Sequence, residues 1–244
     1  MRPVRRGPSP RDDDFADYAD AKPDLVSCLG PYCSFCERRV VTQLAVEHMQ
    51  PKGLPAYAQL IGRWDNFLLA CVNCNSTKGQ KDVRLVDVLL PDRDNTFAAL
   101  SYQPDGTIEP SPLAIASGLS QLVAATLALT GLDKAPADTL DQNGKQVALD
   151  RMRQRMEVWL MAMDAKADVD ANPENQAVRR LVADLAVTNG FFSIWMAIFN
   201  TDTDMLRRLI DSFPGTRESG CFDTNGIPVS PAPNLDALAE GGKI

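Results

Sequence analysis

The spacing of apolar residues divides the chain into two parts of different character. In the first part the apolar positions form short runs, and two of them, Val40–Val46 and Phe67–Ala70, are typical of strands. Farther on, a Pro-Asp-Gly turn at 104–106 separates Phe97–Tyr102 from Thr107–Ile108 and predicts a β-hairpin. We therefore expect small sheets in this part of the chain.

The second part begins near Pro112, where the spacing becomes that of amphipathic helices. Ser111-Pro112 and Asn172-Pro173 are typical of helix starts, because proline is tolerated in the first turn. Five helices are expected, at Leu113–Leu129, Lys145–Lys166, Glu174–Thr188, Phe191–Phe199 and Asp204–Phe213. The pattern predicts an α+β protein, with a small mixed module followed by a mainly α-helical domain.

The composition is that of a globular protein without membrane spans. The chain has 244 residues, of which 45% are apolar and 23% charged. Its longest apolar candidate, Gly190–Phe199, is half the length of about 20 residues that a membrane helix needs. The start, MRPVRRGPSP, is basic but precedes no hydrophobic stretch, so it does not form a secretory signal. We expect a cytoplasmic protein that does not contact a membrane.

The net charge of −7 is distributed unevenly. Residues 28–84 carry a net charge of +3, residues 1–27 carry −1, and the remainder carries −9. Residues 1–27 also mix proline and arginine with a run of three aspartates, and we expect them to form a loosely ordered arm. The charge of residues 28–84 is compatible with local phosphate contacts but provides no long-range attraction of DNA.

Four of the six cysteines form two C-x-x-C pairs, which are Cys33 with Cys36 and Cys71 with Cys74. Such pairs in a cytosolic chain favour metal binding over disulfides, and each pair can supply two thiolates to a tetrahedral Zn²⁺ ion. Four structural thiols or an iron site of the same geometry are the alternatives. Because 34 residues separate the pairs, the loop that the metal closes must contain further structure.

Inside that loop lies the segment Val46-Glu47-His48-Met49-Gln50-Pro51-Lys52, which contains the only histidine of the chain. A lone histidine is more often a structural group than a catalyst, but here Glu47 precedes it and the cysteine pairs flank it. Adjacent strand residues point to opposite faces. If Glu47 and His48 face one metal, the backbone is therefore expected to leave strand geometry there, helped by Pro51 and Gly53.

A third segment runs from Trp64 through an apolar strand into the second cysteine pair and on to Gly79. An asparagine, Asn75, follows that pair directly. If a helix starts there, Asn75 and Lys78 share one of its faces, and its N-terminus favours a nearby anion. Lys52, Arg63 and Lys78 are the candidate phosphate contacts, with solvated surface charge as the alternative for each.

The order C-x-x-C, acid-His, Asn, C-x-x-C-Asn-x-x-Lys-Gly resembles that of the HNH endonucleases, the ββα-metal group. The resemblance covers roughly residues 32–82, about a fifth of the chain. It implies that His48 is the general base, that Glu47 and Asn75 hold the catalytic divalent cation, and that Asn66 braces the hairpin. Two positions depart from the commonest pattern, because Asn75 replaces a histidine and Glu47 replaces an aspartate.

The chemistry is consistent with these residue types. Phosphodiester hydrolysis needs a nucleophilic water, charge neutralisation on the phosphate and assistance to the leaving oxygen. A neutral imidazole with a pKa near its ordinary value of about 6.5 can accept the proton of the water at pH 7. One carboxylate and one amide oxygen suit Mg²⁺ or Mn²⁺, which keep further positions open for phosphate and water.

The resemblance and the composition together divide the chain into four parts. These are an N-terminal arm at 1–27, a zinc-stabilised ββα-metal HNH module at 28–90, a linker with the hairpin at 91–111, and a helical domain at 112–244. Three segments are similar to HNH proteins of bacterial defence loci of the Septu type, which work with an ATPase: Arg63–Cys71, Leu90–Asn95 and Phe213–Thr216. That similarity implies antiphage cleavage of DNA together with a protein partner.

Two other functions remain open at this stage. One is a zinc-knuckle module that binds nucleic acid without cutting it, although such a module has no need of Glu47, His48, Asn66 and Asn75 together. The other is a nuclease directed at RNA, which uses the same chemistry. The sequence does not distinguish DNA from RNA as the substrate.

Overall fold

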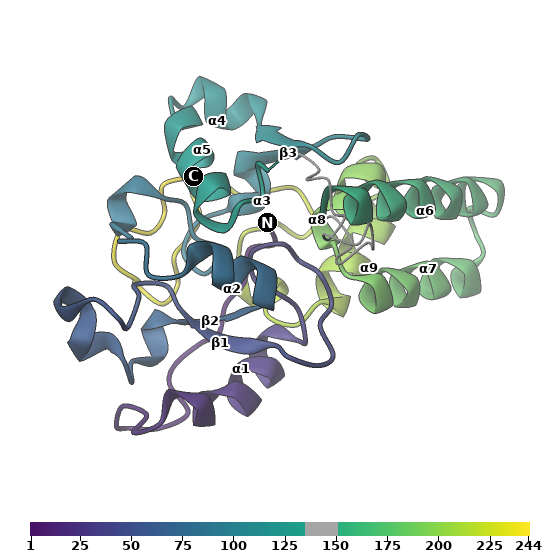
Figure 1. The fold of residues 1–244 in the computed structure, drawn as a ribbon. Helices are drawn as coiled ribbons and strands as arrows, with labels where there is room; N and C mark the ends of the chain where they lie inside the picture. The colour runs from purple at the N-terminus through teal and green to yellow at the C-terminus, as the bar shows by residue number, and fades with distance from the viewer. Residues whose placement is uncertain (135–150) are drawn as a thin grey trace, which may run out of the picture.

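Short helices and two small antiparallel sheets make up the first half of the chain, and helices dominate the second (Figure 1). The fold is described from a computed structural model, which covers residues 1–134 and 151–244. The strands are β1 (Ala45–His48), β2 (Phe67–Ala70), β3 (Leu100–Tyr102) and β4 (Ile108–Pro110). The helices are α1 (Lys22–Leu29), α2 (Val72–Lys78), α3 (Thr96–Ala99), α4 (Pro112–Ala116), α5 (Ser120–Thr130), α6 (Arg151–Ala171), α7 (Gln176–Asn189), α8 (Phe192–Ile198) and α9 (Thr203–Ser212). The prediction of an α+β protein is confirmed.

The first sheet consists of β1 and β2, which pair antiparallel with His48 opposite Phe67. The strand predicted at Phe67–Ala70 is confirmed, whereas the run Val40–Val46 is extended strand only at its last two residues. Gln43 has a φ of 61°, so the chain turns through the left-handed region there and cannot pair continuously. Helix α2 follows β2 directly and packs against β1, which produces a β–β–α unit.

The second sheet is the predicted hairpin, with Tyr102 of β3 opposite Ile108 of β4. The strand expected from Phe97 begins only at Leu100, because residues before it form the one-turn helix α3. Asn95 explains the difference: its side-chain oxygen accepts a hydrogen bond from the backbone of Ala98 at 3.1 Å and caps that helix.

The helices of the second half follow the predicted pattern with one break. The helix expected over Leu113–Leu129 is divided into α4 and α5, because Gly118 adopts a φ of 71° between them. The predicted helices at Glu174–Thr188, Phe191–Phe199 and Asp204–Phe213 correspond to α7, α8 and α9. Residues 145–150 of the remaining predicted helix lie outside the described residues, and its other residues belong to α6.

The predicted loosely ordered arm at 1–27 is wrong for residues 18–27, which form the 3-10 turn Tyr18–Ala21 and most of α1, and it is also wrong for the first six residues. Met1, Val4 and Arg6 are buried, and the backbone N–H of Val4 donates to the carbonyl of Pro91 at 2.7 Å. The guanidinium of Arg6 donates to the carbonyls of Phe67 and Asp65 and to Asp92. The segment therefore holds β2 against residues in the middle of the chain.

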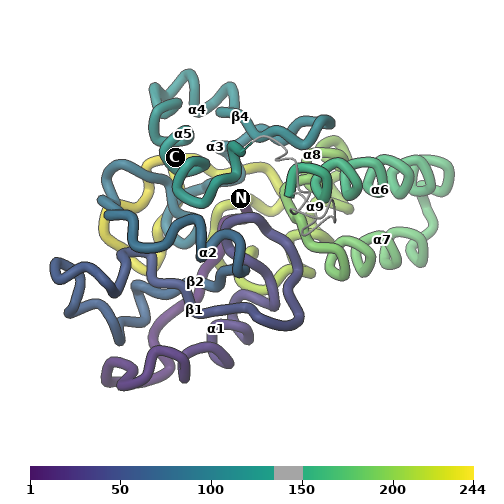
Figure 2. The backbone as a smooth tube through the Cα atoms, viewed as in Figure 1, coloured from purple at the N-terminus to yellow at the C-terminus, as the bar shows by residue number. Residues whose placement is uncertain are grey.

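The C-terminal segment also differs from the expectation of a helical domain that reaches residue 244. Beyond α9 the described chain has only the 3-10 turn Arg217–Ser219, and the rest runs back over the first half of the molecule (Figure 2). The backbone of Gly242 donates to Arg93 at 2.8 Å, and Asn95 donates to Ile244 at 3.0 Å. Residues 92–96, which we expected to belong to a linker, are consequently buried.

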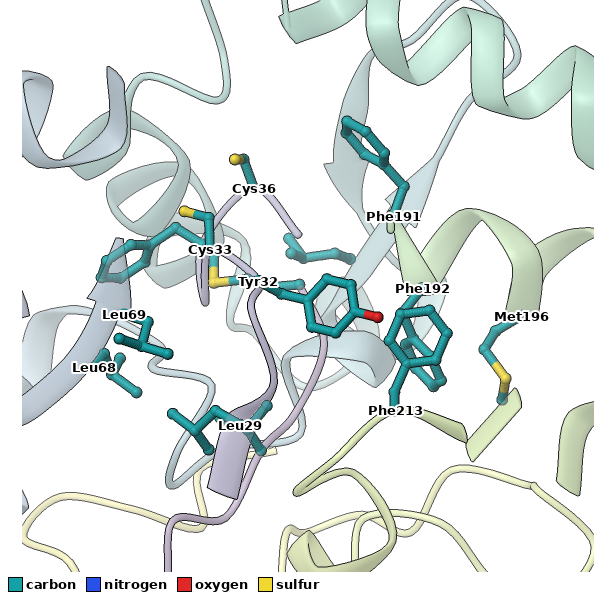
Figure 3. Close-up of a cluster of buried hydrophobic side chains, with 14 of the residues drawn as sticks. Leu29, Tyr32, Cys33, Cys36, Leu68, Leu69, Phe191, Phe192, Met196 and Phe213 are labelled. Atoms are coloured by element: carbon teal, nitrogen blue, oxygen red, sulfur yellow. The ribbon is translucent and has the colours of Figure 1, made fainter. Parts of the chain in front are cut away.

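A continuous hydrophobic core joins the cysteine pairs to the C-terminal helices. Figure 3 shows the ring of Tyr32 between the segment with Cys33 and Cys36 and the rings of Phe192 and Phe213. The Tyr32 and Phe213 centroids are 5.1 Å apart, and the Tyr32 hydroxyl donates to the carbonyl of Val187 at 2.8 Å. Among the described helices, none is both long and apolar enough to cross a membrane.

The ion pairs of Asp92 lead to a prediction about stability. Its carboxylate lies 2.7 Å from Arg6 and 3.0 Å from Arg93, and all three side chains are buried. Burial alone raises the pKa of Asp92, but Arg93 and Arg6 lower it, and the net direction is downward. We expect Asp92→Ala to lower the free energy of unfolding by about 3–5 kcal/mol, because two buried guanidiniums lose their counter-charge.

Urea unfolding followed by circular dichroism measures this loss, with Asp87→Ala as the matched control. Asp87 pairs with Arg84 on the surface, where both side chains are more than half exposed. Its replacement is expected to cost less than about 1 kcal/mol. Equal losses for the two variants would contradict a structural role for Asp92.

Candidate metal centre and adjoining cavity

The two cysteine pairs meet in a buried cluster of four thiols. The Sγ atoms of Cys33, Cys36, Cys71 and Cys74 all lie within 4.8 Å of one another. The sulfurs of Cys36 and Cys71 are 3.7 Å apart, close to the edge of about 3.8 Å in a tetrahedron whose zinc–sulfur bonds are about 2.3 Å. The cluster therefore has the donor set and the spacing of a structural zinc site.

Local structure explains how the pairs reach this geometry. Cys71 is the N-cap residue of α2, so Cys74 lies one turn later in the same helix. The other pair sits in a tight turn in which the backbone of Glu37 donates to Cys33 at 2.9 Å. Glu37 adopts a φ of 64°, and its carboxylate accepts a hydrogen bond from Ser193 in α8. Both sides of the cluster thus belong to well-anchored backbone.

Two arginines donate to the sulfurs. Arg38 lies 3.4 Å from Cys71 Sγ, and Arg151 at the start of α6 lies 3.3 Å from Cys74 Sγ. Arg151 also donates to the carbonyls of Thr130 and Gly131 at 2.8 and 2.6 Å. Four thiolates around Zn²⁺ carry a net charge of −2, and the two guanidiniums offset it. Neither arginine was identified from the sequence, because contact with the cluster depends on distant segments.

The thiols are tightly coupled to one another. Burial raises the pKa of Cys33, and a hydrogen bond with Cys33 raises the pKa of Cys74. Hydrogen bonds with Cys33 lower the pKa of Cys36 and Cys71. A thiol must lose its proton to bind a metal ion as a thiolate, so metal binding at this cluster is expected to be pH-dependent.

A cavity of about 550 Å³ lies beside the cluster, along the edge of β1 that no strand of the described chain pairs with. Its walls come from β1, from α2 and from the helical turn η1 (Tyr18–Ala21) with the start of α1. The polar residues that line it include Glu47, His48, Lys52, Asn75 and Tyr18. The sequence-predicted Glu47, His48 and Asn75 are therefore brought together at one cavity.

Glu47 and His48 both belong to regular strand β1, so the expectation that the backbone leaves strand geometry there is wrong. Their side chains still diverge: Glu47 pairs with Lys78 of α2, whereas His48 packs against Tyr18 and Phe67. Both border the cavity because it lies along the free edge of the strand, which is accessible from either face. No irregular backbone is needed.

The hydrogen bond of His48 assigns its protons. Nε2 lies 2.9 Å from the carbonyl oxygen of Ile61, and a carbonyl only accepts, so Nε2 carries the proton. Nδ1 is then the basic nitrogen of the neutral ring. Burial lowers the pKa of His48, the Ile61 hydrogen bond raises it, and the charges of Lys52 and Lys78 lower it, with a net downward direction. The imidazole is neutral and able to accept a proton at pH 7.

Glu47 is buried and pairs through Oε1 with the ammonium of Lys78 at 2.8 Å. Burial raises the pKa of Glu47, Lys78 and Lys52 lower it, and the net direction is upward. The second oxygen, Oε2, has no hydrogen bond among the described residues. The side-chain amide of Asn75 is likewise without a hydrogen bond in the described part of the chain. Carboxylate and amide oxygens are ligand types that Mg²⁺ and Mn²⁺ accept.

Asn66 lies next to the cavity and holds the segment that follows β1. Its Oδ1 accepts from the backbone N–H of Gln50 at 2.9 Å, and its Nδ2 donates to the carbonyls of Gln50 and Leu60 at 3.0 and 3.3 Å. The Leu60 contact is one residue from Ile61, which bonds His48. Asn66 therefore fixes the loop on which the histidine hydrogen bond depends.

The three predicted phosphate contacts are in different situations. Lys52 is exposed at the cavity, where its ammonium donates to the hydroxyl of Tyr18 and lies 3.8 Å from the centre of its ring. Lys78 is only 1% exposed, and its ammonium is occupied by Glu47 and the carbonyl of His48, so it is a structural ion pair. Arg63 lies outside this cavity and pairs with Asp65.

Tyr18 is the cavity residue that sequence reasoning missed. Its ring packs edge-on against His48, with centroids 4.8 Å apart. It lies in the N-terminal segment, between acidic residues, where no motif or apolar period marks it. Only folding of this segment over β1 reveals its position.

No protein-family model matches this chain, and no curated protein matches it. A functional assignment therefore depends on the cluster, the cavity and the motifs that they contain.

The cysteine cluster predicts one tightly bound zinc ion per chain. Elemental analysis of the purified protein is expected to find one equivalent of zinc, and Cys74→Ser is expected to lose both the zinc and the cooperative fold. Iron in place of zinc, or Cys74→Ser with a full equivalent of zinc, would contradict the assignment. Cys28→Ser is the matched control, because Cys28 is a free cysteine outside the cluster and its replacement should leave the zinc content unchanged.

Proposed function

We propose that this protein is a metal-dependent endonuclease of the HNH type that hydrolyses phosphodiester bonds in DNA. The observation that carries the proposal is that His48, Glu47 and Asn75 line one cavity together. The motif order in residues 32–82 supports the same assignment, as does the β–β–α order of β1, β2 and α2. A module that only binds nucleic acid has no need of a neutral histidine beside free carboxylate and amide oxygens.

In this mechanism His48 acts as the general base. With Nε2 donating to Ile61, Nδ1 accepts the proton of a water molecule that attacks the phosphorus. Tyr18 and Phe67 pack against the ring on two sides and restrict its rotation. Asn66 is a positioning residue, because it holds the loop that carries the Ile61 carbonyl.

Glu47 and Asn75 would hold the catalytic divalent cation, which when bound neutralises charge on the phosphate and assists the leaving oxygen. Lys78 lowers the pKa of Glu47 against the effect of burial, and it fixes the carboxylate against α2. Lys52, exposed at the mouth of the cavity, provides a positive charge for the substrate phosphate.

The proposal includes a protein partner and a role in antiphage defence, which rest on the similarity to Septu-type nucleases. Charge supports the partner. Residues 28–84 carry a net charge of only +3, while residues 85–244 carry −9. Non-specific DNA affinity grows with the number of lysine and arginine contacts, so a chain of this charge is expected to bind DNA weakly by itself. The proposed ATPase partner delivers the nuclease to DNA.

Cleavage is expected to depend on His48. His48→Ala should lower the rate by about 10²–10⁴-fold, because the water loses its proton acceptor, while the zinc content and circular dichroism stay unchanged. The assay uses supercoiled DNA, linear DNA and RNA with Mg²⁺ or Mn²⁺, and with EDTA as the metal-free reference. A rate above about a tenth of wild type would exclude the general-base role, and cleavage of RNA alone would correct the substrate.

Asn75→Ala is the cleaner test of the cation site, because Asn75 is half-buried and its amide has no partner in the described chain. Replacement of Glu47 also breaks a buried ion pair and so affects stability. Asn75→Ala should retain zinc and lose activity, with Gln59→Ala, at an exposed position, as the control. Loss of zinc in Asn75→Ala would contradict the division into two metal sites.

The pH dependence follows from the environment of His48. Because its pKa is lowered, kcat/KM is expected to rise with pH around a midpoint below 6.5 and to reach a plateau at neutral pH. Lys52→Met removes a positive charge that lowers the pKa of both His48 and Glu47, so the midpoint should move to higher pH. Arg63 lies outside the cavity, so Arg63→Met should leave the midpoint of the pH profile unchanged. A midpoint that falls, or that moves equally in both variants, would contradict the assigned base.

A further inference from the structure

Helices α6 and α7 form a hairpin that extends away from the sheets and the cysteine cluster (Figure 1). Four residues connect them, so they run antiparallel and pack against each other. A groove of about 700 Å³ lies between them. In Figure 1 helices α6 and α7 lie well apart from β1, which lines the other cavity.

The floor of the groove is apolar. Met161 and Ala165 of α6 face Val178 and Val182 of α7 across it. Along the α7 side the groove is bordered by Leu181, which is 61% exposed, and by Leu185, which is 37% exposed. Two leucines one turn apart on an exposed edge form a continuous apolar strip with the floor. Exposed apolar surface that continues into a groove is suited to contact with another chain.

The α6 side of the groove is acidic. Asp164 and Asp168 line it one turn apart, on the same face of the helix. Neither carboxylate has a hydrogen-bond or ion-pair partner within residues 1–134 and 151–244. The neighbouring lysine, Lys166, pairs instead with Asp170 at 2.7 Å, so it does not neutralise them. The groove therefore combines an apolar floor with two adjacent, unneutralised negative charges along one side.

We propose that this groove binds a basic amphipathic helix of a partner protein. Apolar side chains at positions i, i+3, i+4 and i+7 of such a helix would cover the floor and the two leucines. Lysines or arginines one turn apart on its flank would face Asp164 and Asp168. The charge of the groove selects a basic helix over an acidic one. This surface does not depend on the nuclease activity, although it is suited to the partner that the proposed function includes.

The test uses the full chain and a designed probe. The probe is an 18-residue helical peptide with leucines on one face and lysines on the other, labelled for fluorescence anisotropy. We expect the wild-type protein to bind it more tightly than the same peptide with glutamates in place of lysines, and to lose affinity as salt rises. Because binding is read without any cleavage, failure here leaves the nuclease proposal untouched.

Two variants locate the binding. Leu181→Ser is expected to lower the affinity for the lysine peptide by about tenfold or more, because apolar burial is lost. The double variant Asp164→Asn with Asp168→Asn is expected to lower it by about threefold to tenfold. All three side chains lie on the surface, so the fold is not at risk. The matched controls are Ile115→Ser, at an exposed apolar position of α4, and Asp12→Asn with Asp13→Asn. Both controls should bind as the wild type does.

Three outcomes would overturn the proposal. The first is absence of binding by the wild-type chain. The second is equal affinity for the lysine and glutamate peptides, or equal losses in groove and control variants. The third is a dimer in sedimentation analysis that dissociates on Leu181→Ser, since a second copy of the chain would then be the occupant.

Discussion

Closure of the loop between the two cysteine pairs is the constraint on which this structure depends. Residues 37–70 begin and end at the four-thiol cluster, and they contain β1, β2 and the segment that joins them. A two-stranded sheet with four residues per strand has too little apolar area to be stable alone. The cluster fixes the ends of the loop, and α2, whose N-cap residue is Cys71, transmits that constraint to Lys78 and Glu47.

The cavity follows from this arrangement. Because β1 pairs with one strand in the described part of the chain, its other edge is available there, and side chains from both of its faces reach that edge. The ion pair of Glu47 with Lys78 lies on one side, and the aromatic contacts of His48 lie on the other. The lysine also donates to the carbonyl of His48, so the acid and the histidine are coupled through one buried ammonium. A substitution at Glu47, His48 or Lys78 is therefore expected to alter the contacts of the other two residues.

Segments distant in sequence complete the structure. The first six residues and the last few meet at residues 90–96, where Asp92 binds Arg6 and Arg93, and Asn95 donates to the carbonyls of Cys221 and Val229. Arg151 connects the start of α6 to Cys74. The mixed module and the helices therefore share one hydrophobic core and one polar network. The cysteine cluster is contacted by residues from both halves of the chain.

The sequence alone determined the α+β class, the cysteine quartet, β2, the β3–β4 hairpin and most of the helices, because each depends on local spacing. It also singled out Glu47, His48 and Asn75 as candidates by their positions between and after the cysteine pairs, and the three residues line one cavity. Only the tertiary structure decided that Lys78 is buried in an ion pair and that the first six residues are core. Only the tertiary structure also showed the contacts of Tyr18 and Arg151. Their partners lie far away in the chain, so the local spacing of residues does not predict these contacts.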